Sequence, residues 1–242
     1  MIHICIRPTL DWKNQKAVDA RLLPAFRLKF DMWNATFEMP YQVFRQRVQQ
    51  IAQLNHSRVE GATCSAIEDV PSGHVIVPVD DDDWFSPDLA NRLRQEHDPR
   101  VRRYLWRREV IESPRPIRSS LSRMARLLGR ADQFTCKTNN YAVVNEPGLA
   151  HLALNHVRAS EYFDAHPSDI KRIPATLAIQ NRNLASQTAL AWNRPSITQE
   201  ELLNVWYRYR HLYSSRTLGA RLSWAKPYVD LMAELMHEIH VK

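Results

Sequence analysis

The chain has 242 residues, of which 44% are hydrophobic and 24% charged, enough for a domain with a sizeable buried core. Its formal net charge of +7 favours anionic partners: nucleic acid, an anionic membrane surface or a phosphorylated small molecule. Cys5, Cys64 and Cys136 are too few and too scattered for a disulfide-rich scaffold or a paired zinc site. A reducing cytoplasm is therefore the expected compartment.

The N-terminal segment argues against export and membrane insertion. MIHICIRPTLDWKNQK, residues 1–16, has only a short apolar run before proline and charge, so it lacks the apolar core of a signal peptide. No window of the sequence approaches the length of a membrane span. We expect a soluble or peripheral protein, cytoplasmic or at the inner face of the membrane.

The first part of the chain predicts a strand followed by helices. Residues 2–6 form an apolar run that ends before Pro8, which favours a short buried strand. Residues 42–54 place Val, Ile and Leu among Arg and Gln at helical spacing, and this predicts an amphipathic helix. A second helix is expected around residues 64–67.

A β-branched run at residues 75–79 is typical of a strand covered on both faces. Pro78 within it favours a strand end or an edge strand, because proline donates no ladder hydrogen bond. Ser86 and the Pro-Asp dipeptide after it predict a helix start, with Leu89 and Leu93 on the apolar face.

The remaining elements complete an α/β pattern. In chain order we expect an extended segment at residues 104–111, strands at 134–136 and 141–144, a helix opened by residues 146–148 and carrying Leu149, Leu152, Leu154 and Val157, a strand at 173–179, and helices beyond Pro195. The sequence shows no repeats and no low-complexity linker. We therefore predict an α/β domain over residues 1–195 and a helical C-terminal extension packed on it over residues 196–242.

Four consecutive aspartates, Asp80 to Asp83, follow the run at residues 75–79. Adjacent carboxylates repel one another, so a cation is needed to offset them. In open α/β sheets, ligands bind beyond the carboxyl ends of strands, and carboxylates there suit Mg²⁺ or Mn²⁺ shared with substrate phosphates. In an extended chain, alternation would pair Asp80 with Asp82 and Asp81 with Asp83. The alternative is a solvated acidic turn that complements the dipole of the next helix.

GHVIVPVDDDDWFSPDL, residues 73–89, resembles the metal-binding segment of family 2 and related glycosyltransferases of the GT-A fold. Weaker similarity to rhamnosyltransferase-like members covers GATCSAIEDVPS, residues 61–72, and LAIQNRNLASQT, residues 177–188. The resemblance implies a GT-A-type, Rossmann-like mixed sheet flanked by helices. It also implies a nucleotide-sugar donor and a divalent metal, manganese or magnesium.

The resemblance assigns roles to individual residues. Asp80 would contact the nucleotide sugar, or the metal through water, and Asp82 would ligate the metal that bridges the diphosphate. Asp83 would support the donor sugar or the metal shell. Arg7, Pro8 and Thr9 match in position the loop that receives the nucleotide.

Two features of the family pattern are missing from this chain. The acidic, Gly/Ser-rich turn after the second strand is absent between residues 22 and 55, which leaves the nucleotide open. In place of the Glu-Asp pair before the late strand stands ASEYFDAH, residues 159–166. An inverting transfer needs a general base, and Glu161 lies where the resemblance would put it, with Asp164 as the second candidate. His166 could complete a metal shell, although a lone histidine is more often structural.

Basic residues are concentrated in two stretches. Between Arg92 and Arg130 there are 12 Arg and only 4 acidic residues. Arg100, Arg102, Arg103, Arg107 and Arg108 could meet a diphosphate, an anionic saccharide or lipid head groups, or form a solvated face. In VWYRYRHLY, residues 205–213, helical spacing predicts packed aromatic side chains, with Arg208, Arg210 and His211 outward.

These features predict a metal-dependent hexosyltransferase that moves a sugar from a nucleotide donor to a saccharide or lipid-linked acceptor, with inversion. No nucleic-acid partner is expected, and peripheral membrane association would suit a lipid-linked acceptor. One alternative is a phosphatase or phosphotransferase with Asp80 as nucleophile and Asp82 as acid. Another is a basic nucleic-acid-binding protein, which would explain the charge but not the aspartates.

Overall fold

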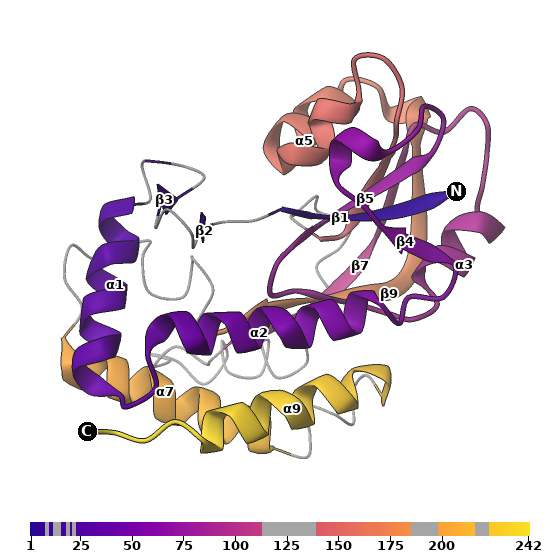
Figure 1. Cartoon of the computed structure of the whole chain (residues 1–242). Coiled ribbons are helices and arrows are strands. Elements are labelled where there is room, and N and C mark those ends of the chain that lie inside the picture. The colour runs from indigo at the N-terminus through magenta and orange to yellow at the C-terminus, as the bar shows by residue number, and fades with distance from the viewer. Residues whose placement is uncertain are drawn as a thin grey trace, which may run out of the picture. The chain divides into compact units, whose positions relative to one another are not determined.

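The structure is a computed structural model that describes residues 1–7, 10–11, 16–17, 20, 23–112, 139–184, 198–215 and 223–242 (Figure 1). Its elements in chain order are β1 (Ile2–Arg7), β2 (Leu10–Asp11), β3 (Lys16–Ala17), α1 (Leu23–Thr36), α2 (Tyr41–His56), β4 (Ala62–Cys64), η2 (Ile67–Asp69), β5 (Val75–Asp80), β6 (Trp84–Phe85), α3 (Leu89–Gln95), β7 (Arg103–Glu112), β8 (Tyr141–Val144), η3 (Ala150–Leu154), α5 (His156–Asp164), η4 (Pro167–Asp169), β9 (Ile170–Arg182), α7 (Gln199–Ser214), η5 (Ser223–Ala225) and α9 (Lys226–His237).

The chain forms two compact units. The sheet unit comprises Met1–Arg7, Leu54–Val110 and the described part of Ile117–Gln180. The helical unit comprises the described parts of Pro8–Gln53, Ile111–Pro116 and Asn181–Lys242. The boundary expected between residues 195 and 196 lies outside the described residues, so it stays a prediction.

A mixed sheet forms the centre of the sheet unit. Its 7 strands lie in the order β4-β1-β5-β8-β7-β9-β6. Strand β1 pairs in parallel with both β4 and β5, whereas β8 is antiparallel to β5 and β7, and β6 is antiparallel to β9. The expectation of an α/β fold with a mixed sheet is confirmed at this level.

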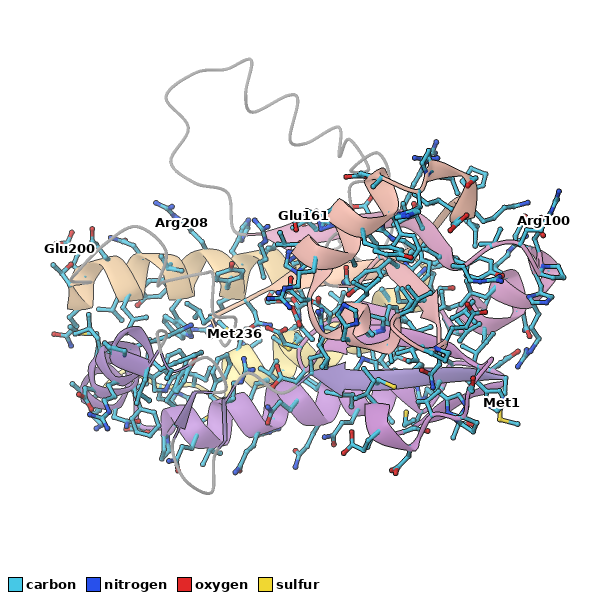
Figure 2. The ribbon with its side chains drawn as sticks, turned by 90° about the horizontal axis from the view of Figure 1, so that it is seen from above. Met1, Arg100, Glu161, Glu200, Arg208 and Met236 are labelled. Atoms are coloured by element: carbon cyan, nitrogen blue, oxygen red, sulfur yellow. The ribbon has the colours of Figure 1, made fainter. Side chains whose placement is uncertain are left out.

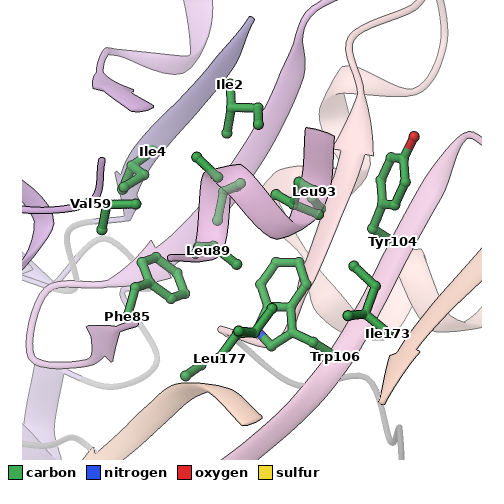
Figure 3. Close-up of a cluster of buried hydrophobic side chains, with 14 of the residues drawn as sticks. Ile2, Ile4, Val59, Phe85, Leu89, Leu93, Tyr104, Trp106, Ile173 and Leu177 are labelled. Atoms are coloured by element: carbon green, nitrogen blue, oxygen red, sulfur yellow. The ribbon is translucent and has the colours of Figure 1, made fainter. Parts of the chain in front are cut away.

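The two faces of the sheet carry separate cores because successive side chains of a strand point to opposite faces. Ile2 and Ile4 of β1 belong to a core with Leu89 and Leu93 of α3 (Figure 3). Cys5 lies in the other core, which includes Ala159 and Phe163 of α5, so each face of the sheet is covered by a helix.

The prediction of a helix around residues 64–67 is wrong. Ala62–Cys64 instead forms strand β4, which pairs with β1 so that Cys64 lies opposite Ile4. Only a single 3₁₀ turn, η2, follows at Ile67–Asp69. The conformation of this segment is determined by its pairing with β1, which cannot be predicted from the residues of the segment alone.

Strand β5 is central and continues for two residues beyond Pro78, so both positions expected from Pro78, a strand end and an edge strand, are wrong. It lies between β1 and β8. Its ladder with β8 covers only Val75 and Ile76, and Pro78 lies beyond these pairs. A missing N–H is tolerated there because no β8 residue is paired with Pro78.

Most other predicted elements of the sheet unit are confirmed. Helix α3 follows Ser86, and β7, β8 and β9 cover the predicted extended segments. The helix expected after residues 146–148 is instead divided into η3 and α5, and Leu154 and Val157 are exposed rather than on its packed face. The strand predicted at residues 134–136 lies outside the described residues.

The helical unit is built on aromatic packing. The Trp33 ring stacks on Phe44 at 4.5 Å between centroids, and Phe37 lies 5.4 Å from Trp206 of α7. A capping box of Thr198 and Glu201 begins α7. The predicted packing of the aromatic side chains is confirmed for Trp206, Tyr209 and Tyr213, which are buried, and is wrong for Tyr207, which is 55% exposed. Of the cationic residues expected to point outward, His211 is exposed, whereas Arg208 and Arg210 are half-buried.

Candidate functional site

The order of the parallel strands singles out one point at the edge of the sheet. The chain visits β1, β4 and β5 in that order, but β1 lies between the other two. The chain that leaves β1 therefore re-enters the sheet at β4, on one side of β1. The connection that follows β4 re-enters it at β5, on the other side. In open α/β sheets, ligands bind beyond the carboxyl ends of the strands at such a switch point. Here the two strands end at Arg7 and Asp80, which are opposite each other in register.

Asp80 to Asp83, here called the aspartate turn, begin at this point. Strand β5 ends at Asp80, and the Asp83 N–H donates a hydrogen bond of 3.2 Å to the Asp80 carbonyl. The side chain of Asp80 is 26% exposed, whereas Asp81, Asp82 and Asp83 are buried. The alternation argument for pairing Asp80 with Asp82 was wrong, because the chain turns at residues 81–82 instead of remaining extended.

Arg7 provides part of the positive charge that the aspartate turn requires. Its Nη2 atom lies 3.2 Å from Oδ1 of Asp80, and its side chain is only 12% exposed. An ion pair so shielded from water is stronger than one on an open surface. The structure therefore brings together Arg7 and Asp80, two of the residues predicted for the site. Pro8 and Thr9, predicted with it, lie outside the described residues.

The end of helix α2 fixes the chain that leaves the aspartate turn. The side-chain amide of Asn55 donates to the Phe85 carbonyl at 2.8 Å and accepts from the Phe85 N–H at 2.6 Å. Nε2 of His56 lies 2.9 Å from the Asp83 carbonyl oxygen. Because a carbonyl only accepts, His56 carries its proton on Nε2.

His56 is held in its neutral form by its surroundings. Burial lowers the pKa of its imidazole to about 4, against the opposing effects of the Asp83 carbonyl and the Asp81 charge. At neutral pH the ring is therefore an uncharged hydrogen-bond donor. It adds no positive charge to the aspartate turn.

Buried polar residues beyond the turn were not assigned a role from the sequence. The Asn140 amide donates to the Trp106 carbonyl at 3.0 Å, and the Asn139 amide donates to the carbonyl of Ile179, the residue opposite Trp84. Both asparagines are fully buried. The polar TNN between two strands was the available signal for them, whereas nothing in the sequence pointed to Asn55 or His56.

The arginines of the basic stretch that the structure describes, residues 92–108, lie in different environments. Arg100 projects from the surface (Figure 2) and pairs with Asp98, and Arg102 pairs with Glu146 at 2.7 Å. Arg103 and Arg108 are buried, and they lie on opposite faces of β7 because they are 5 residues apart in a strand. Nη1 of Arg108 donates to Gln180 at 2.6 Å.

The two candidates for the general base lie on α5, as Figure 2 shows for Glu161. Both carboxylates are exposed, and Asp164 accepts a hydrogen bond of 3.3 Å from Ser160. Helix α5 contacts the sheet at Arg103, whose side chain donates to the Ala159 carbonyl. Within the sheet, Arg103 is paired with Val143, and Val143 is paired with Ile76. Ile76 is four residues before Asp80, roughly 13 Å along the strand. No contact among the described residues joins Glu161 or Asp164 to the aspartate turn.

His166 has local partners. Its ring stacks on Tyr162 at 4.4 Å, and Nδ1 lies 2.7 Å from the Tyr162 carbonyl oxygen. These contacts fix the ring against the end of its own helix. They offer no observation in favour of the metal-shell role that the sequence left open.

The aspartate turn suits a cation that is shared with a substrate. Within the described part of the chain, no three side chains of His, Cys, Asp or Glu are placed to hold a metal ion by themselves. Mg²⁺ and Mn²⁺, however, commonly bind through one or two carboxylates and complete their shell with water and phosphate oxygens. Asp80, whose side chain is 26% exposed, could provide one such carboxylate from this turn.

Comparisons with known proteins identify no family: no protein-family model matches the chain, and no curated protein is significantly similar to it. Among the described residues, no helix combines the length and the apolar character needed to cross a membrane.

Proposed function

We propose that this protein is a metal-dependent glycosyltransferase of the GT-A type, which transfers a hexose from a nucleoside diphosphate donor to a saccharide or lipid-linked acceptor. The observation that carries the proposal is the position of the aspartate turn. It lies at the carboxyl end of β5, next to the end of β1, where the parallel strand order reverses. Open α/β sheets bind their ligands at this position.

The mixed sheet and the motif support the same proposal. GHVIVPVDDDDWFSPDL forms a central strand, a turn and a helix start in this structure, which is the arrangement that its resemblance to family 2 glycosyltransferases implies. In the proposed roles, Asp80 and Asp82 bind the divalent cation, Mn²⁺ or Mg²⁺. Asp80 and Asp83 also contact the nucleotide sugar, and Arg7 faces its phosphates.

The chemistry needs charge stabilisation and one proton acceptor. When bound, the divalent cation would neutralise the charge that develops on the diphosphate as the glycosidic bond breaks. Arg7 adds a fixed positive charge beside Asp80. Glu161 is the proposed base that takes the proton of the acceptor hydroxyl, with Asp164 as the alternative. Direct attack by the acceptor inverts the configuration of the sugar.

Donor binding tests this function. UDP-, GDP- and dTDP-sugars should be titrated calorimetrically into the protein with MnCl₂ and, separately, with EDTA. We expect at least one donor to bind only when the metal is present, and Asp82→Asn to remove that binding. Asp88→Asn is the matched control, because Asp88 is a half-exposed acidic residue of the same segment, paired with Arg92 at 2.9 Å.

The outcomes separate the candidate functions. If no nucleotide sugar binds with metal, and Asp82→Asn changes no response, the glycosyltransferase proposal fails. Hydrolysis of a phosphate ester that depends on Asp80 would instead support the phosphatase alternative. Binding of single-stranded nucleic acid that is insensitive to Asp82→Asn would support the third candidate.

A further inference from the structure

Helix α2 ends against the segment that follows the aspartate turn. Three contacts join the two segments: Asn55 with Phe85, His56 with Asp83, and the Glu60 N–H with the Pro87 carbonyl at 3.0 Å. Asn55 and Phe85 are 30 residues apart in the sequence, and His56 and Asp83 are 27 apart. These are therefore tertiary contacts and not part of a local turn. Asn55 and His56 are 1% and 2% exposed.

Asn55 takes the place of a neighbouring strand. Strand β6 is at the end of the sheet and has β9 on one side only. Phe85 lies opposite Ala178, while the following Ser86 N–H donates to Leu177 of β9. The N–H and carbonyl of Phe85 therefore point away from β9, and both are bound by the single side-chain amide of Asn55. This fixes the orientation of the peptide groups on both sides of Phe85.

His56 binds the main chain two residues before Phe85. It donates to the carbonyl of Asp83, the last residue of the aspartate turn, and its ring lies 5.8 Å from the Phe85 ring. Because the hydrogen bond reaches a main-chain atom, it constrains the backbone of the turn without occupying any carboxylate. Its burial excludes water from competing for that carbonyl.

The aspartate turn needs such a restraint. Its carboxylates repel one another, and a short loop bearing four of them would relax toward separated side chains in the absence of a bound cation. Supporting groups that fix the ligands of a metal typically contribute a factor of about 10–100 to its affinity. Asn55 and His56 hold the exit of the turn from a helix end, which is a rigid element.

We propose that Asn55 and His56 are positioning residues that hold the aspartate turn in the conformation that binds the divalent cation. This proposal rests on the proposed function, since it concerns the cation of that site. The two residues touch neither the cation nor the donor. They act only through the main chain of Asp83 and Phe85.

Mn²⁺ affinity measures this role directly. Mn²⁺ alone is titrated into the full chain, and the paramagnetic resonance signal of the free ion gives the dissociation constant. We expect Asn55→Leu and His56→Leu to weaken Mn²⁺ binding by at least about tenfold. His56→Gln should stay within about twofold of the wild type, because the glutamine amide nitrogen can donate in place of Nε2.

The control is Ser57→Ala at the same helix end, where the serine hydroxyl donates only to the Leu54 carbonyl. It should leave the Mn²⁺ affinity unchanged. Circular dichroism and thermal unfolding show which variants are folded at the titration temperature. If Asn55→Leu does not fold, the comparison of His56→Leu with His56→Gln decides alone.

Three outcomes are distinguishable. Folded Asn55→Leu and His56→Leu with wild-type Mn²⁺ affinity would overturn the positioning role and leave the proposed function intact. Weakened Mn²⁺ binding in these variants, with no nucleotide sugar bound by the wild type, would support the positioning role and contradict the glycosyltransferase. A wild-type protein that binds no Mn²⁺ would overturn both.

Discussion

Nη2 of Arg7 lies 3.2 Å from Oδ1 of Asp80, so the first aspartate of the turn already has a cationic partner supplied by the neighbouring strand. Arg7 and a metal ion would neutralise the same group of carboxylates. Each should therefore contribute more to the stability of the protein when the other is missing. This reciprocity is measurable.

We predict that Arg7→Gln lowers stability without metal by about 1.5–3 kcal/mol, the usual contribution of a charged hydrogen bond. For a chain of this size, that corresponds to roughly 2–4 °C in melting temperature per kcal/mol. Added MnCl₂ should raise the melting temperature of the variant more than that of the wild type, because the ion replaces the lost charge. Arg92→Gln, which removes an exposed pair with Asp88, is the control. Equal Mn²⁺ responses in all three proteins would contradict the shared role.

Acid should destabilise the protein through His3, which is buried beside the half-buried His74. Nε2 of His3 lies 2.9 Å from Nδ1 of His74, and Nδ1 of His3 lies 2.9 Å from the Ser65 hydroxyl. Burial lowers the pKa of His3, and the charges of His74 and the N-terminal ammonium group lower it further. His3 is therefore neutral in the folded protein at a pH where the unfolded chain already binds a proton.

The sign follows from proton linkage. Below about pH 6.5, the ordinary pKa of histidine, the unfolded state binds more protons than the folded state, so stability falls as the pH falls. One such proton contributes a slope of up to about 1.4 kcal/mol per pH unit. Urea unfolding at pH 7.5, 6.5 and 5.5 should show a shallower pH dependence for His3→Gln than for the wild type. The same slope in both proteins would exclude His3 as the source.

Arg103 offers a test of a buried cation that has aromatic partners. Its guanidinium carbon lies 5.0 Å from the Phe163 ring centre and 5.5 Å from that of Tyr141, and Nη1 donates to the Ala159 carbonyl at 3.2 Å. In the described part of the chain, no carboxylate pairs with it. A buried charge costs desolvation free energy that these contacts must offset.

We expect Arg103→Met to be neutral or stabilising, because an apolar side chain of similar length fills the space without that cost. Arg103→Ala should lose about 2–5 kcal/mol, since it leaves a cavity between the two rings. Chemical denaturation gives both values. If methionine is as destabilising as alanine, the contacts of the cation with the rings stabilise the fold, and packing volume does not account for the effect.

The general base is tested by separating binding from transfer. We predict that Glu161→Gln lowers the rate of sugar transfer by a factor of about 100 or more, while donor affinity stays unchanged. Single-turnover transfer and calorimetry measure the two quantities. Asp164→Asn is the matched variant on the same exposed helix. Full activity of Glu161→Gln together with loss of activity in Asp164→Asn would move the role to Asp164.

The sequence predicted the elements whose signals are local. Apolar runs marked β1 and β5, and the acidic cluster marked the end of β5. Strand β4 was not predicted, because its conformation is determined by its pairing with β1. Ile2 and Ala62, which are opposite each other in this pairing, are 60 residues apart in the sequence. The GT-A fold and the roles of the aspartates remain predictions that rest on the motif.

The candidate site extends further than local patterns could show. Asn55 and His56 close an amphipathic helix and look like ordinary polar residues at its end. Only the tertiary fold brings them to Phe85 and Asp83. The resemblance matched Arg7 to a loop that receives the nucleotide, but its pairing with Asp80 depends on the register of two strands that are distant in sequence.

The contact of Asn55 with Phe85 also affects how the molecule meets other copies of itself. The last strand of a sheet normally presents open N–H and carbonyl groups, on which a strand from another chain can add. At Phe85 both groups are already bound by a buried side chain. The sheet therefore cannot be extended at this residue.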